Sequence, residues 1–410
     1  MYLTRHLETR LNLVAQHSKV ILVTGARQVG KSTLLKNCFP HLPHITFDPH
    51  QDIYNIRQDP DLFLKQYNTP IILDEIQFYP ELLSSIKRFA DQSDRPGQYY
   101  LTGSQNLSML KNAAESMAGR VAILPLYPMT LHELYQHVNS HWLPVLLEDP
   151  DLLPQRFKGI IKDFSLWKDM WQGGLPGLIS QPNELFGTYF SSYVQTYIER
   201  DIRLIEDIRD LNSFRQFLGV LAALTSQEIN LNELGGRIGV THKTVDRWLN
   251  LLVNTYQWYL INPYHGNTLK RITKKPKGVI ADTGLAVHLV QLMSPATLGT
   301  YPGLGSLFES YILNQVFGAS TQLSSLPGIY HWRSHNGAEV DLLFEQNGFL
   351  YPIEIKMKSY LTKNDTRGLR AFRETYPSDR IKTGVIIYAG DRCYHVDESV
   401  IAVPCHGLFS

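Results

Sequence analysis

The feature that most constrains the fold is a glycine-rich stretch near the N-terminus, Gly-Ala-Arg-Gln-Val-Gly-Lys-Ser-Thr over residues 25–33. It fits the pattern G-x-x-x-x-G-K-[ST]. An apolar run over 20–24 precedes it, and residues 34–39 read as the start of a helix. A strand, a glycine turn and a helix in this order form a loop whose N–H groups and helix N-terminus favour a phosphate. The stretch therefore predicts a site for a nucleoside triphosphate.

The residues of this stretch have distinct predicted roles. Lys31 would reach the β- and γ-phosphates, and the Ser32 hydroxyl would ligate Mg²⁺. The alternative is a glycine loop that merely precedes a helix, and the Lys-Ser-Thr offset argues against it. The predicted nucleotide-binding residues are Gly25, Ala26, Arg27, Gln28, Val29, Gly30, Lys31, Ser32 and Thr33.

Composition limits the remaining classes of protein. The chain has 410 residues, which is long enough for two or three domains of roughly 100–200 residues each. Its net charge of +1 means that any surface for nucleic acid must be local. Cys38, Cys393 and Cys405 are too few and too scattered for a disulfide framework. No apolar run is long enough to span a membrane and the N-terminus is not a signal peptide, so we expect a cytoplasmic protein without membrane contact.

Two acids end the next apolar run, Pro-Ile-Ile-Leu-Asp-Glu-Ile-Gln over residues 70–77. After a phosphate-binding loop this is the Walker B arrangement. Asp74 would hold Mg²⁺ through water, and Glu75 would orient or deprotonate the attacking water. The alternative is a core strand with acids at its solvent end.

A further predicted strand, residues 98–105, ends in polar residues that could sense the γ-phosphate. Thr102 and Ser104 could bind the γ-phosphate or the attacking water, or could simply mark a turn. Arg120 could sense the phosphate, act in trans on a neighbouring copy, or be a surface charge. Strands alternate with helices through residue 126, which predicts a parallel α/β sheet with the nucleotide at the strand carboxyl ends.

The middle of the chain is expected to be mainly helical. The Pro-rich, acidic stretch 141–154 reads as an insertion or hinge, and 193–209 reads as a strong helix with a solvated charged face. Residues 229–252 then have the form of a helix-turn-helix. Gly239 would make its turn, and Thr241 would cap the second helix.

A basic hairpin is predicted to follow as the wing of a winged helix. Its first strand would be 258–261 and its return strand would end in the basic run 269–277. This local excess of positive charge is typical of a surface for phosphate backbones. A lid or a protein-contact module is the alternative. The predicted DNA-binding residues are Lys243, Arg247, Lys270, Arg271, Lys274, Lys275 and Lys277.

The C-terminal third carries a second group of chemically active residue types. Asp341 lies on one strand of a predicted hairpin, and Glu354 and Lys356 lie two apart, hence on one face, of its partner. The two acids could bind Mg²⁺ with Glu309 from the preceding helix, and Lys356 could steady a phosphate or position water. Pairing of the charges among themselves, or of Asp341 with Arg333, is the alternative.

With these residues in view, the chain resembles the prokaryotic AAA-type P-loop ATPases that carry a winged helix and a restriction-endonuclease-like, PD-(D/E)xK, C-terminal domain. The resemblance rests on residues 25–33, 73–77 and 101–105, and further along on 197–202, 282–285 and the Glu-Val-Asp…Ile-Glu-Ile-Lys stretch. It covers nearly the whole chain. It implies ATP and Mg²⁺ as ligands of Lys31, Ser32, Asp74 and Glu75, and a nuclease pattern in Asp341, Glu354 and Lys356.

These observations give a fold class and a functional hypothesis. We expect an α/β chain made of a P-loop domain (1–140), a helical linker or lid (141–210), a winged helix (211–290) and an α/β nuclease-like domain (291–410). ATP hydrolysis would control DNA contact and a metal-dependent nuclease-like domain, and a homo-oligomer is a candidate assembly. The alternatives are a nucleotide-operated switch with an inactive C-terminal scaffold, and a DNA-binding regulator that ATP only stabilises.

Overall fold

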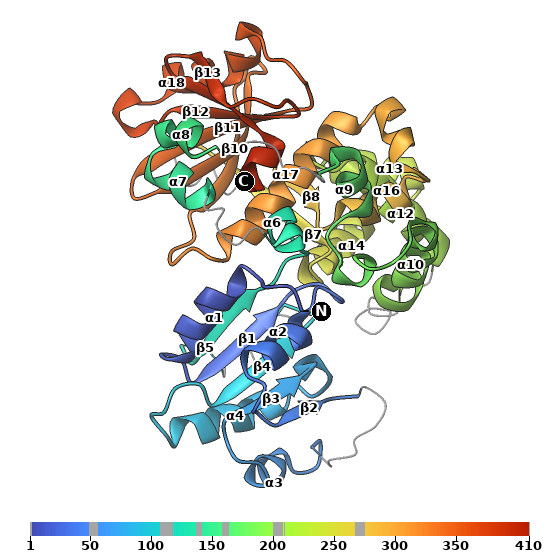
Figure 1. Ribbon diagram of the computed structural model, residues 1–410. Coiled ribbons are helices and arrows are strands. Elements are labelled where there is room, and N and C mark those ends of the chain that lie inside the picture. Colours follow the sequence, from blue (N-terminus) through green and yellow to red (C-terminus); the bar gives the residue numbers. More distant parts are fainter. Residues whose placement is uncertain are drawn as a thin grey trace.

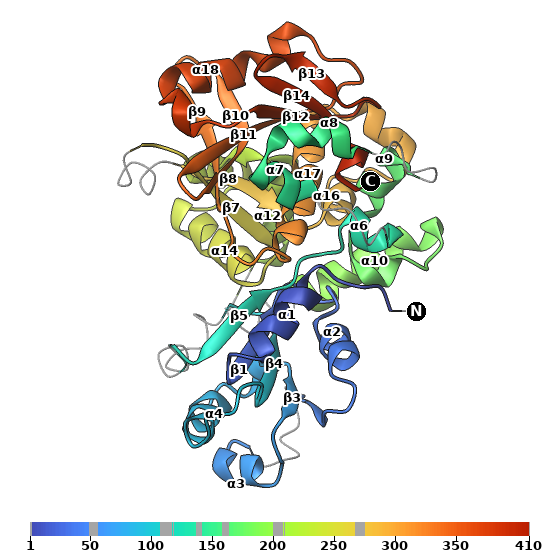
Figure 2. The same cartoon turned by 60° about the vertical axis from the view of Figure 1, so that its left-hand side comes forward.

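The computed structural model describes residues 2–48, 56–106, 117, 119–136, 142–157, 164–199, 208, 210–266 and 275–409. Three parts follow one another along the chain: an N-terminal sheet with its helices, a helical middle, and a C-terminal sheet (Figures 1 and 2). The N-terminal part lies at the bottom of Figure 1, and the other two parts lie side by side above it.

The N-terminal sheet is parallel throughout, as the alternation of strands and helices predicts. Its order is β2-β3-β4-β1-β5, so β1 and β3 both flank β4. The carboxyl ends of parallel strands lie at one edge of a sheet, which brings the ends of β1, β3 and β4 together. The strands are β1 (Val20–Thr24), β2 (His44–Thr46), β3 (Ile71–Asp74), β4 (Tyr99–Gly103) and β5 (Val121–Pro125).

Helices pack on this sheet through their apolar faces. In α4 the buried residues Leu82, Leu83, Ile86 and Ala90 recur at helical spacing. These side chains join a core on one face of the sheet, while the other face shares a core with the helical middle. The helices are α1 (Leu7–Ala15), α2 (Lys31–Cys38), α3 (Pro60–Lys65) and α4 (Leu82–Asp91), with a short 3₁₀ turn over Ile76–Phe78.

The helical middle contains the predicted pair of helices. Gly239, with φ of 72°, ends α13, and the Thr241 hydroxyl accepts from the Thr244 N–H at 3.2 Å to cap α14. The predicted helix over 193–209 is different: α10 passes at Val194 into a π-helix that ends at Glu199, and 200–207 and 209 lie outside the described residues. The helices are α6 (Leu131–Tyr135), α7 (Trp142–Glu148), α8 (Leu153–Arg156), α9 (Leu166–Gln172), α10 (Phe186–Tyr193), α12 (Leu211–Ala223), α13 (Leu231–Ile238), α14 (His242–Asn254) and α16 (Thr283–Leu289).

The strand that returns beside β7 (Trp258–Pro263) corrects the predicted hairpin. It is β8, Lys277–Ile280, and it begins where the predicted return strand ends. All four of its residues are buried, and Gly278 packs so closely that a Cβ there would lie 2.4 Å from the Trp258 Nε1 atom. A run of unpaired basic residues could not form this buried strand, because unpaired charges are costly to bury. Residues 267–274 lie outside the described part of the chain.

One sheet runs through the predicted winged helix and the C-terminal part. Its order is β13-β14-β12-β11-β10-β9-β7-β8-β6. The junction is a parallel pairing of β7 with β9, in which Asn262 faces Tyr330 and Pro263 faces His331. The strands on the two sides of the predicted domain boundary near residue 290 therefore belong to one sheet. The other strands are β6 (Gln227–Glu228), β9 (Gly328–Arg333), β10 (Glu339–Gln346), β11 (Phe349–Lys356), β12 (Gly384–Tyr388), β13 (Tyr394–Asp397) and β14 (Val400–Pro404).

Helices cover both faces of this C-terminal sheet. The long α17 (Leu304–Ser320) packs against β8 and β11, and α18 (Arg367–Thr375) packs on β10 and β11. The expected hinge over 141–154 instead forms α7, a 3₁₀ turn and α8, which pack on the C-terminal part. There the Tyr351 hydroxyl donates to the Leu147 carbonyl oxygen at 2.6 Å. Further 3₁₀ turns span Pro150–Leu152, Pro176–Leu178, Asn183–Leu185, Pro295–Thr300, Lys363–Thr366, Ser378–Arg380 and Cys405–Phe409.

Candidate functional site

The glycine-rich loop connects the end of β1 to the start of α2, as its sequence predicts. Gly25 has φ of 148°, and a Cβ there would lie 2.2 Å from the Leu126 carbonyl oxygen. Gly30, with φ of 97°, adopts a backbone conformation that favours glycine and leads directly into α2. Close packing thus requires glycine at 25 and the positive φ favours it at 30, and the N–H groups at the start of α2 provide a place for an anion.

Lys31 lies buried inside this loop. Its ammonium group donates to the carbonyl oxygens of Gly25 at 3.0 Å and Ala26 at 2.9 Å. These acceptors are neutral, so the lysine can exchange them for phosphate oxygens with a gain in charge pairing. The position agrees with the predicted phosphate-binding role.

Asp74 is the centre of the polar cluster at the strand ends. Its Oδ1 accepts from the Ser32 hydroxyl at 2.7 Å and from the Thr102 hydroxyl at 2.5 Å. The carboxyl group is almost fully buried, with 4% exposed. A hydroxyl and a carboxylate oxygen side by side next to the phosphate loop are suitable donors for Mg²⁺. The residues present therefore fit the predicted metal.

The second oxygen of Asp74 faces β2. The Thr46 hydroxyl donates to Oδ2 at 3.3 Å, and His44 Nε2 lies 3.6 Å from it. Burial lowers the pKa of His44, although the neighbouring Asp74 opposes the shift. The lowered pKa favours the neutral form of the His44 imidazole.

Glu75 is held by the neighbouring strand and by an amide that sequence reasoning did not single out. Its backbone has φ of 62°, and its N–H donates to the Thr102 hydroxyl at 2.9 Å. Its carboxylate accepts from the side-chain amide of Gln77, which also donates to the Ser104 hydroxyl at 3.1 Å. Gln77 therefore links the predicted water-activating acid to the predicted sensor residue. The sequence signal for this role of Gln77 is a side-chain amide two positions after Glu75.

The loop is also touched by segments from elsewhere in the chain. Tyr193 on α10 donates from its hydroxyl to the Arg27 carbonyl oxygen at 3.2 Å, and Tyr189 bonds to the side chain of Gln28. Just beyond β4, the Asn106 N–H donates to the carbonyl oxygen of Asn254, the last residue of α14. The predicted nucleotide site is thus in direct contact with the helical middle, including the second helix of the helix-turn-helix.

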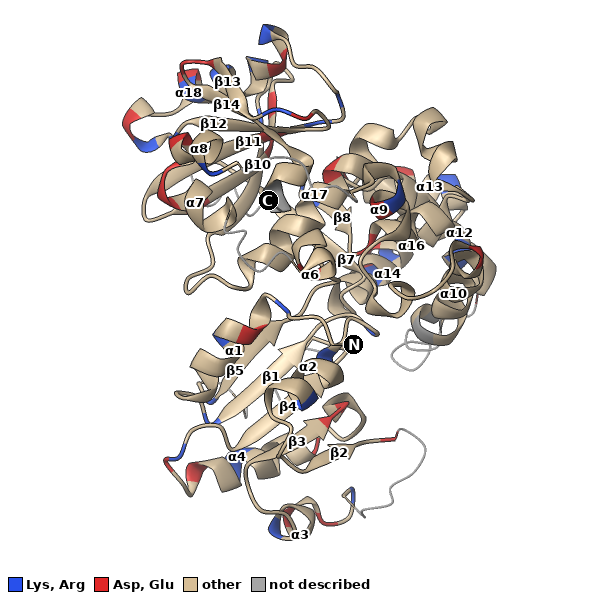
Figure 3. Cartoon of the chain, viewed as in Figure 1, with Lys and Arg blue, Asp and Glu red and all other residues tan. Residues whose placement is uncertain are grey.

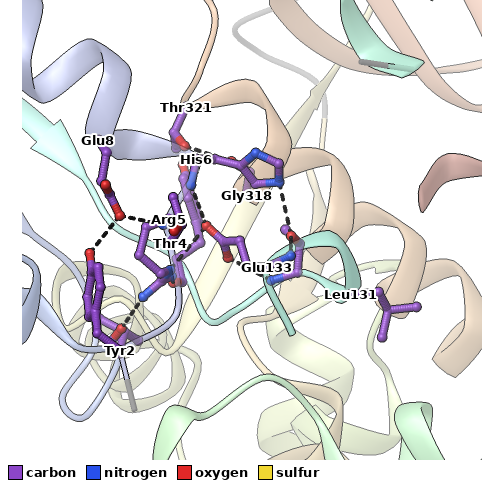
Figure 4. A network of polar contacts seen from close by, with 12 residues as sticks. Tyr2, Thr4, Arg5, His6, Glu8, Leu131, Glu133, Gly318 and Thr321 are labelled. Atoms are coloured by element: carbon purple, nitrogen blue, oxygen red, sulfur yellow. Dashed lines mark hydrogen bonds and ion pairs between the residues drawn. The ribbon is translucent and has the colours of Figure 1, made fainter. Parts of the chain in front are cut away.

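A buried network around Arg5 connects the loop to α17 (Figure 4). The Arg5 guanidinium donates to the Val29 carbonyl oxygen at 2.7 Å and pairs with Glu133 at 3.1 Å. Glu133 caps α6, and at the start of the same helix the Leu131 N–H donates to the Gln315 side chain of α17 at 2.7 Å. Burial favours the neutral form of Glu133, but Arg5 and His6 outweigh it and lower the pKa of Glu133.

Of the three alternatives for Arg120, the structure favours a surface charge over a phosphate sensor beside its own glycine loop. Arg120 directly precedes β5. The first residue of β5, Val121, pairs with Val20, the first residue of β1, whereas the glycine loop follows the last residue of β1. The Arg120 guanidinium pairs with Asp91 at 2.9 Å on an exposed surface. The strand direction explains this position, because residues that precede a parallel strand lie at the amino edge of the sheet, away from the phosphate site at the carboxyl edge.

A second cluster brings together Asp341, Glu354 and Lys356, as the hairpin pattern predicts. The Lys356 ammonium lies 2.8 Å from Glu354 Oε2 and 3.7 Å from Asp341 Oδ2. Burial and the neighbouring Asp341 raise the pKa of Glu354 well above its usual value. Burial also acts against ionisation of Asp341, but the two lysines beside it outweigh this and lower its pKa. The two carboxyl groups are therefore buried, while the Lys356 side chain beside them is 27% exposed.

Glu309 and Lys277 depart from their predicted roles. The Lys277 ammonium lies 2.6 Å from Glu309 Oε1 and 3.7 Å from Asp341 Oδ1, and its side chain is 9% exposed. Burial raises the pKa of Glu309 to about 8, even though Lys277 opposes the shift. Lys277 is thus an internal counter-ion and not a surface contact for DNA, and Glu309 is bonded to it. Among the described residues, no three His, Cys, Asp or Glu side chains gather to hold a metal ion.

The other predicted DNA-binding residues are only partly described. Lys243 and Arg247 lie exposed on α14, and Lys275 is exposed just before β8. Figure 3 marks the Lys and Arg positions of the chain in blue, with segments on α2, α13 and α14 among them. Lys270, Arg271 and Lys274 lie outside the described residues. Within the described chain, no helix is both long and apolar enough to cross a membrane.

Comparison with known proteins gives three family matches along the chain. Residues 17–135 match the AAA domain, residues 164–296 match a domain of unknown function (DUF8612), and residues 304–408 match another (DUF4143). An uncharacterized protein of Mycobacterium tuberculosis and one of Mycobacterium bovis are each 28% identical to this chain over 408 residues, covering 99% of this chain and 84% of the relative. An uncharacterized protein of Haemophilus influenzae is 20% identical, covering 66% of this chain and 68% of its own.

Solved structures superpose only loosely. The Walker-type ATPase of Pyrococcus abyssi has a TM-score of 0.40 at 16% identity and covers 70% of this chain and 96% of its own. The RuvB Holliday junction branch migration motor of Thermotoga maritima has a TM-score of 0.30 at 15% identity, covering 62% and 88%. Superpositions this loose carry no argument, so the AAA match and the parallel sheet that it spans decide the assignment. Residues 17–135 match the AAA domain, and this match supports an AAA-type P-loop ATPase domain in the N-terminal third of the chain.

Proposed function

We propose that this chain binds ATP with Mg²⁺ and hydrolyses it at the ends of β1, β3 and β4. One observation carries the proposal: a single carboxylate, Asp74, accepts hydrogen bonds from both Ser32 and Thr102 beside the glycine-rich loop. This arrangement brings the proposed metal-binding residues, the glycine-rich loop and the proposed sensor strand together. Such preorganisation lowers the cost of stabilising charge in the transition state.

The residues of the site divide the work. Lys31 and the loop N–H groups bind the phosphates, and Ser32 and Asp74 would hold Mg²⁺. The metal, when bound, offsets the negative charge of the phosphates. Glu75 orients a water molecule and accepts its proton, while Gln77 and Ser104 fix the position of Glu75.

The substitution Glu75→Gln tests this assignment. We expect steady-state phosphate release to fall by roughly 100-fold or more, because general base catalysis contributes about 10²–10⁴-fold. ATP binding should persist, since the loop and Asp74 are unchanged. Glu81→Gln, which removes an exposed carboxylate at the start of α4, is the matched control. Unchanged phosphate release in Glu75→Gln would show that Glu75 is not the hydrolytic residue.

We further propose that the nucleotide state acts on the helix-turn-helix, which contacts DNA. The support is the bond from Asn106, beside the sensor strand, to Asn254 at the end of α14. Lys243 and Arg247 on this helix, with Lys275 before β8, would contact phosphates. Each phosphate contact contributes about one unit to the salt slope of DNA binding.

The salt dependence of DNA binding tests this contact. The slope of log affinity against log salt should become shallower by roughly two units in Lys243→Ala/Arg247→Ala. Arg237→Ala on α13, whose guanidinium pairs with Glu233, is the control and should leave the slope unchanged. Identical slopes for wild type and the double variant would exclude α14 as a phosphate contact.

A second candidate function, a metal-dependent nuclease, is favoured by the cluster of Asp341, Glu354 and Lys356. The support is that Asp341 lies on β10 and that Glu354 and Lys356 lie on β11, the strand paired with it. The two acids would hold a divalent cation, and Lys356 would steady the phosphate.

Plasmid DNA cleavage with Mg²⁺ or Mn²⁺ distinguishes this function from a scaffold role. Wild type should cut, and Lys356→Ala should not. Lys358→Ala, which removes a half-exposed lysine two positions further along, is the control. The absence of cutting under every metal and nucleotide condition would leave the alternative, a nucleotide-operated switch with an inactive C-terminal scaffold.

A further inference from the structure

Lys277 lies on β8, a strand of the predicted winged helix, and its side chain reaches the cluster that contains Asp341. It is the first residue of β8, where its backbone pairs with Ile261 of β7 and Glu228 of β6. Its side chain crosses toward α17 and β10 and ends between Glu309 and Asp341. The cluster that resembles a nuclease site therefore receives a cation from the hairpin of the helix-turn-helix.

Both oxygens of Asp341 face a positive charge. Oδ1 lies 3.7 Å from Lys277, and Oδ2 lies 3.7 Å from Lys356 and accepts from the Ile355 N–H at 2.8 Å. A divalent cation bound to Asp341 would sit about 2.1 Å from an oxygen, if it is Mg²⁺. At Oδ1 it would be pressed against the Lys277 ammonium group, and like charges at such separations repel strongly away from water.

Lys277 also withholds a metal ligand. The Glu309 carboxylate lies 2.6 Å from the lysine and does not join Asp341 and Glu354 in a group that could hold a metal ion. Two carboxylates alone make an incomplete shell, because Mg²⁺ and Ca²⁺ bind through several oxygens. If Lys277 moved away, Asp341 would gain an open oxygen and Glu309 would become available on the same side.

The residues before Lys277 provide a way to move it. Lys275 is exposed and is followed by Pro276, which restricts Lys275 to extended backbone. Side chains two positions apart in extended chain lie on the same side. Lys275 and Lys277 therefore lie on the same side of the chain, two residues apart, with Lys275 exposed and Lys277 buried.

We propose that Lys277 is a tethered cation that blocks metal binding at the Asp341 cluster, and that a nucleic-acid phosphate backbone bound at Lys275 draws it out. Glu309, Asp341 and Glu354 then hold a divalent cation together. The inference rests on the second candidate function, in which this cluster binds metal. Blocking by Lys277 would keep the nuclease-like domain inactive until a phosphate backbone binds at Lys275.

Mn²⁺ binding, followed by electron paramagnetic resonance of the free ion, tests the proposal without measuring cleavage. All samples are the full chain without nucleotide and carry Asp74→Asn, so that the P-loop site does not contribute. In this background we expect Lys277→Gln to bind Mn²⁺ roughly tenfold more tightly or better, the range over which outer-shell groups change metal affinity. A duplex oligonucleotide should tighten Mn²⁺ binding with Lys277 present and have little effect in Lys277→Gln. Lys358→Gln removes the same charge nearby and should change neither result.

The outcomes separate the two proposals. If Mn²⁺ binds equally well with and without Lys277, and Asp341→Asn abolishes it, the metal site stands and the blocking role of Lys277 is wrong. If Asp341→Asn leaves Mn²⁺ binding unchanged, or no sample binds Mn²⁺, the cluster is no metal site and the second candidate function fails with it. Should Lys277→Gln fold poorly, Lys277→Met keeps the apolar stem of the side chain, removes its charge and leaves Glu309 in place. It should still bind Mn²⁺ more tightly than the parent.

Discussion

The two candidate sites of this molecule each contain buried lysines, but the partners of those lysines differ. Lys31 donates to two backbone carbonyl oxygens of its own loop. Lys277 and Lys356 lie against the carboxylates of Glu309, Asp341 and Glu354. A lysine on neutral acceptors gains by moving to a phosphate, whereas a lysine on a carboxylate must first leave a full negative charge.

This difference implies two modes of regulation. In the proposed P-loop site, Lys31 would exchange two neutral carbonyl acceptors for phosphate oxygens. The C-terminal cluster already neutralises much of its own charge, so a metal or phosphate must displace an internal partner. Substitutions at the two sites should therefore differ in whether they affect activity or stability.

The largest effect is expected for Lys31→Ala. Phosphate release should fall by roughly 100-fold or more, because the substitution removes a positive charge aimed at the transferred phosphate. Folding should be affected less than catalysis, since the lost acceptors are neutral. Phosphate release and urea unfolding of the same preparations measure both. If Lys31→Ala unfolded the chain while leaving the rate per folded molecule intact, the contrast between the two sites would collapse.

A large effect on stability is expected for Arg5→Met, in the network between the two sites. The change leaves the buried Glu133 charge without its guanidinium, at a cost of about 3–5 kcal/mol. Arg5→Met/Glu133→Gln is the control, and it should recover part of the loss. Urea unfolding monitored by circular dichroism measures both, and a single variant as stable as the wild type would show that the network does not brace the loop.

The same pair predicts a dependence of stability on pH. The pKa of Glu133 is lowered in the folded chain from its ordinary 4.5, so the pair stabilises the fold fully above that value. The contribution should disappear as the pH falls through the lower, folded pKa. Arg5→Met/Glu133→Gln should lack this part of the acid sensitivity. An identical acid unfolding profile in both proteins would contradict the assignment.

A smaller stability effect is expected for Lys356→Ala. Its ammonium group is the hydrogen-bonded partner of the buried Glu354, and bonds to charged groups contribute about 2 kcal/mol. Lys358→Ala should cost less, because that lysine is half exposed. If Lys356→Ala were as stable as the wild type, the C-terminal cluster would not depend on its internal charges, and the contrast with Lys31 would be weakened.

The smallest effect is expected for Arg120→Ala. The guanidinium pairs with Asp91 on an open surface, and pairs of this kind contribute little. Neither the unfolding midpoint nor phosphate release should change measurably. A marked fall in phosphate release that depends on protein concentration would instead show that Arg120 acts on the nucleotide of another copy.

The N-terminal part of the fold was predictable because its signals are local. The apolar run before Gly25 and the run that ends in Asp74 each form a strand of the parallel sheet, and parallel strands share one carboxyl edge. The meeting of Ser32 with Asp74 followed from that rule. The Asn347-Gly348 turn was predictable for a similar reason, since both residues adopt the positive φ that a tight hairpin requires.

What could not be predicted depends on contacts distant in sequence. Lys277 was counted with the basic residues of the hairpin, and its burial is decided by Glu309 and Asp341, which come later in the chain. Gln77 meets Glu75 only because Glu75 has positive φ, which its residue type does not indicate. In β10 a bulge between Val340 and Leu343 interrupts the regular register beside Asp341, and alternation alone does not reveal it.

The pairing of β7 with β9 has a consequence for how the chain is made. When β7 leaves the ribosome, β9 has not yet been synthesised, and the edge of β7 that will receive it is unpaired. Open strand edges are places where chains associate. A nascent chain, or a fragment that ends after α16, thus exposes the unpaired edge of β7 beside the helix-turn-helix. The helix-turn-helix therefore completes its sheet only when the C-terminal third has been translated.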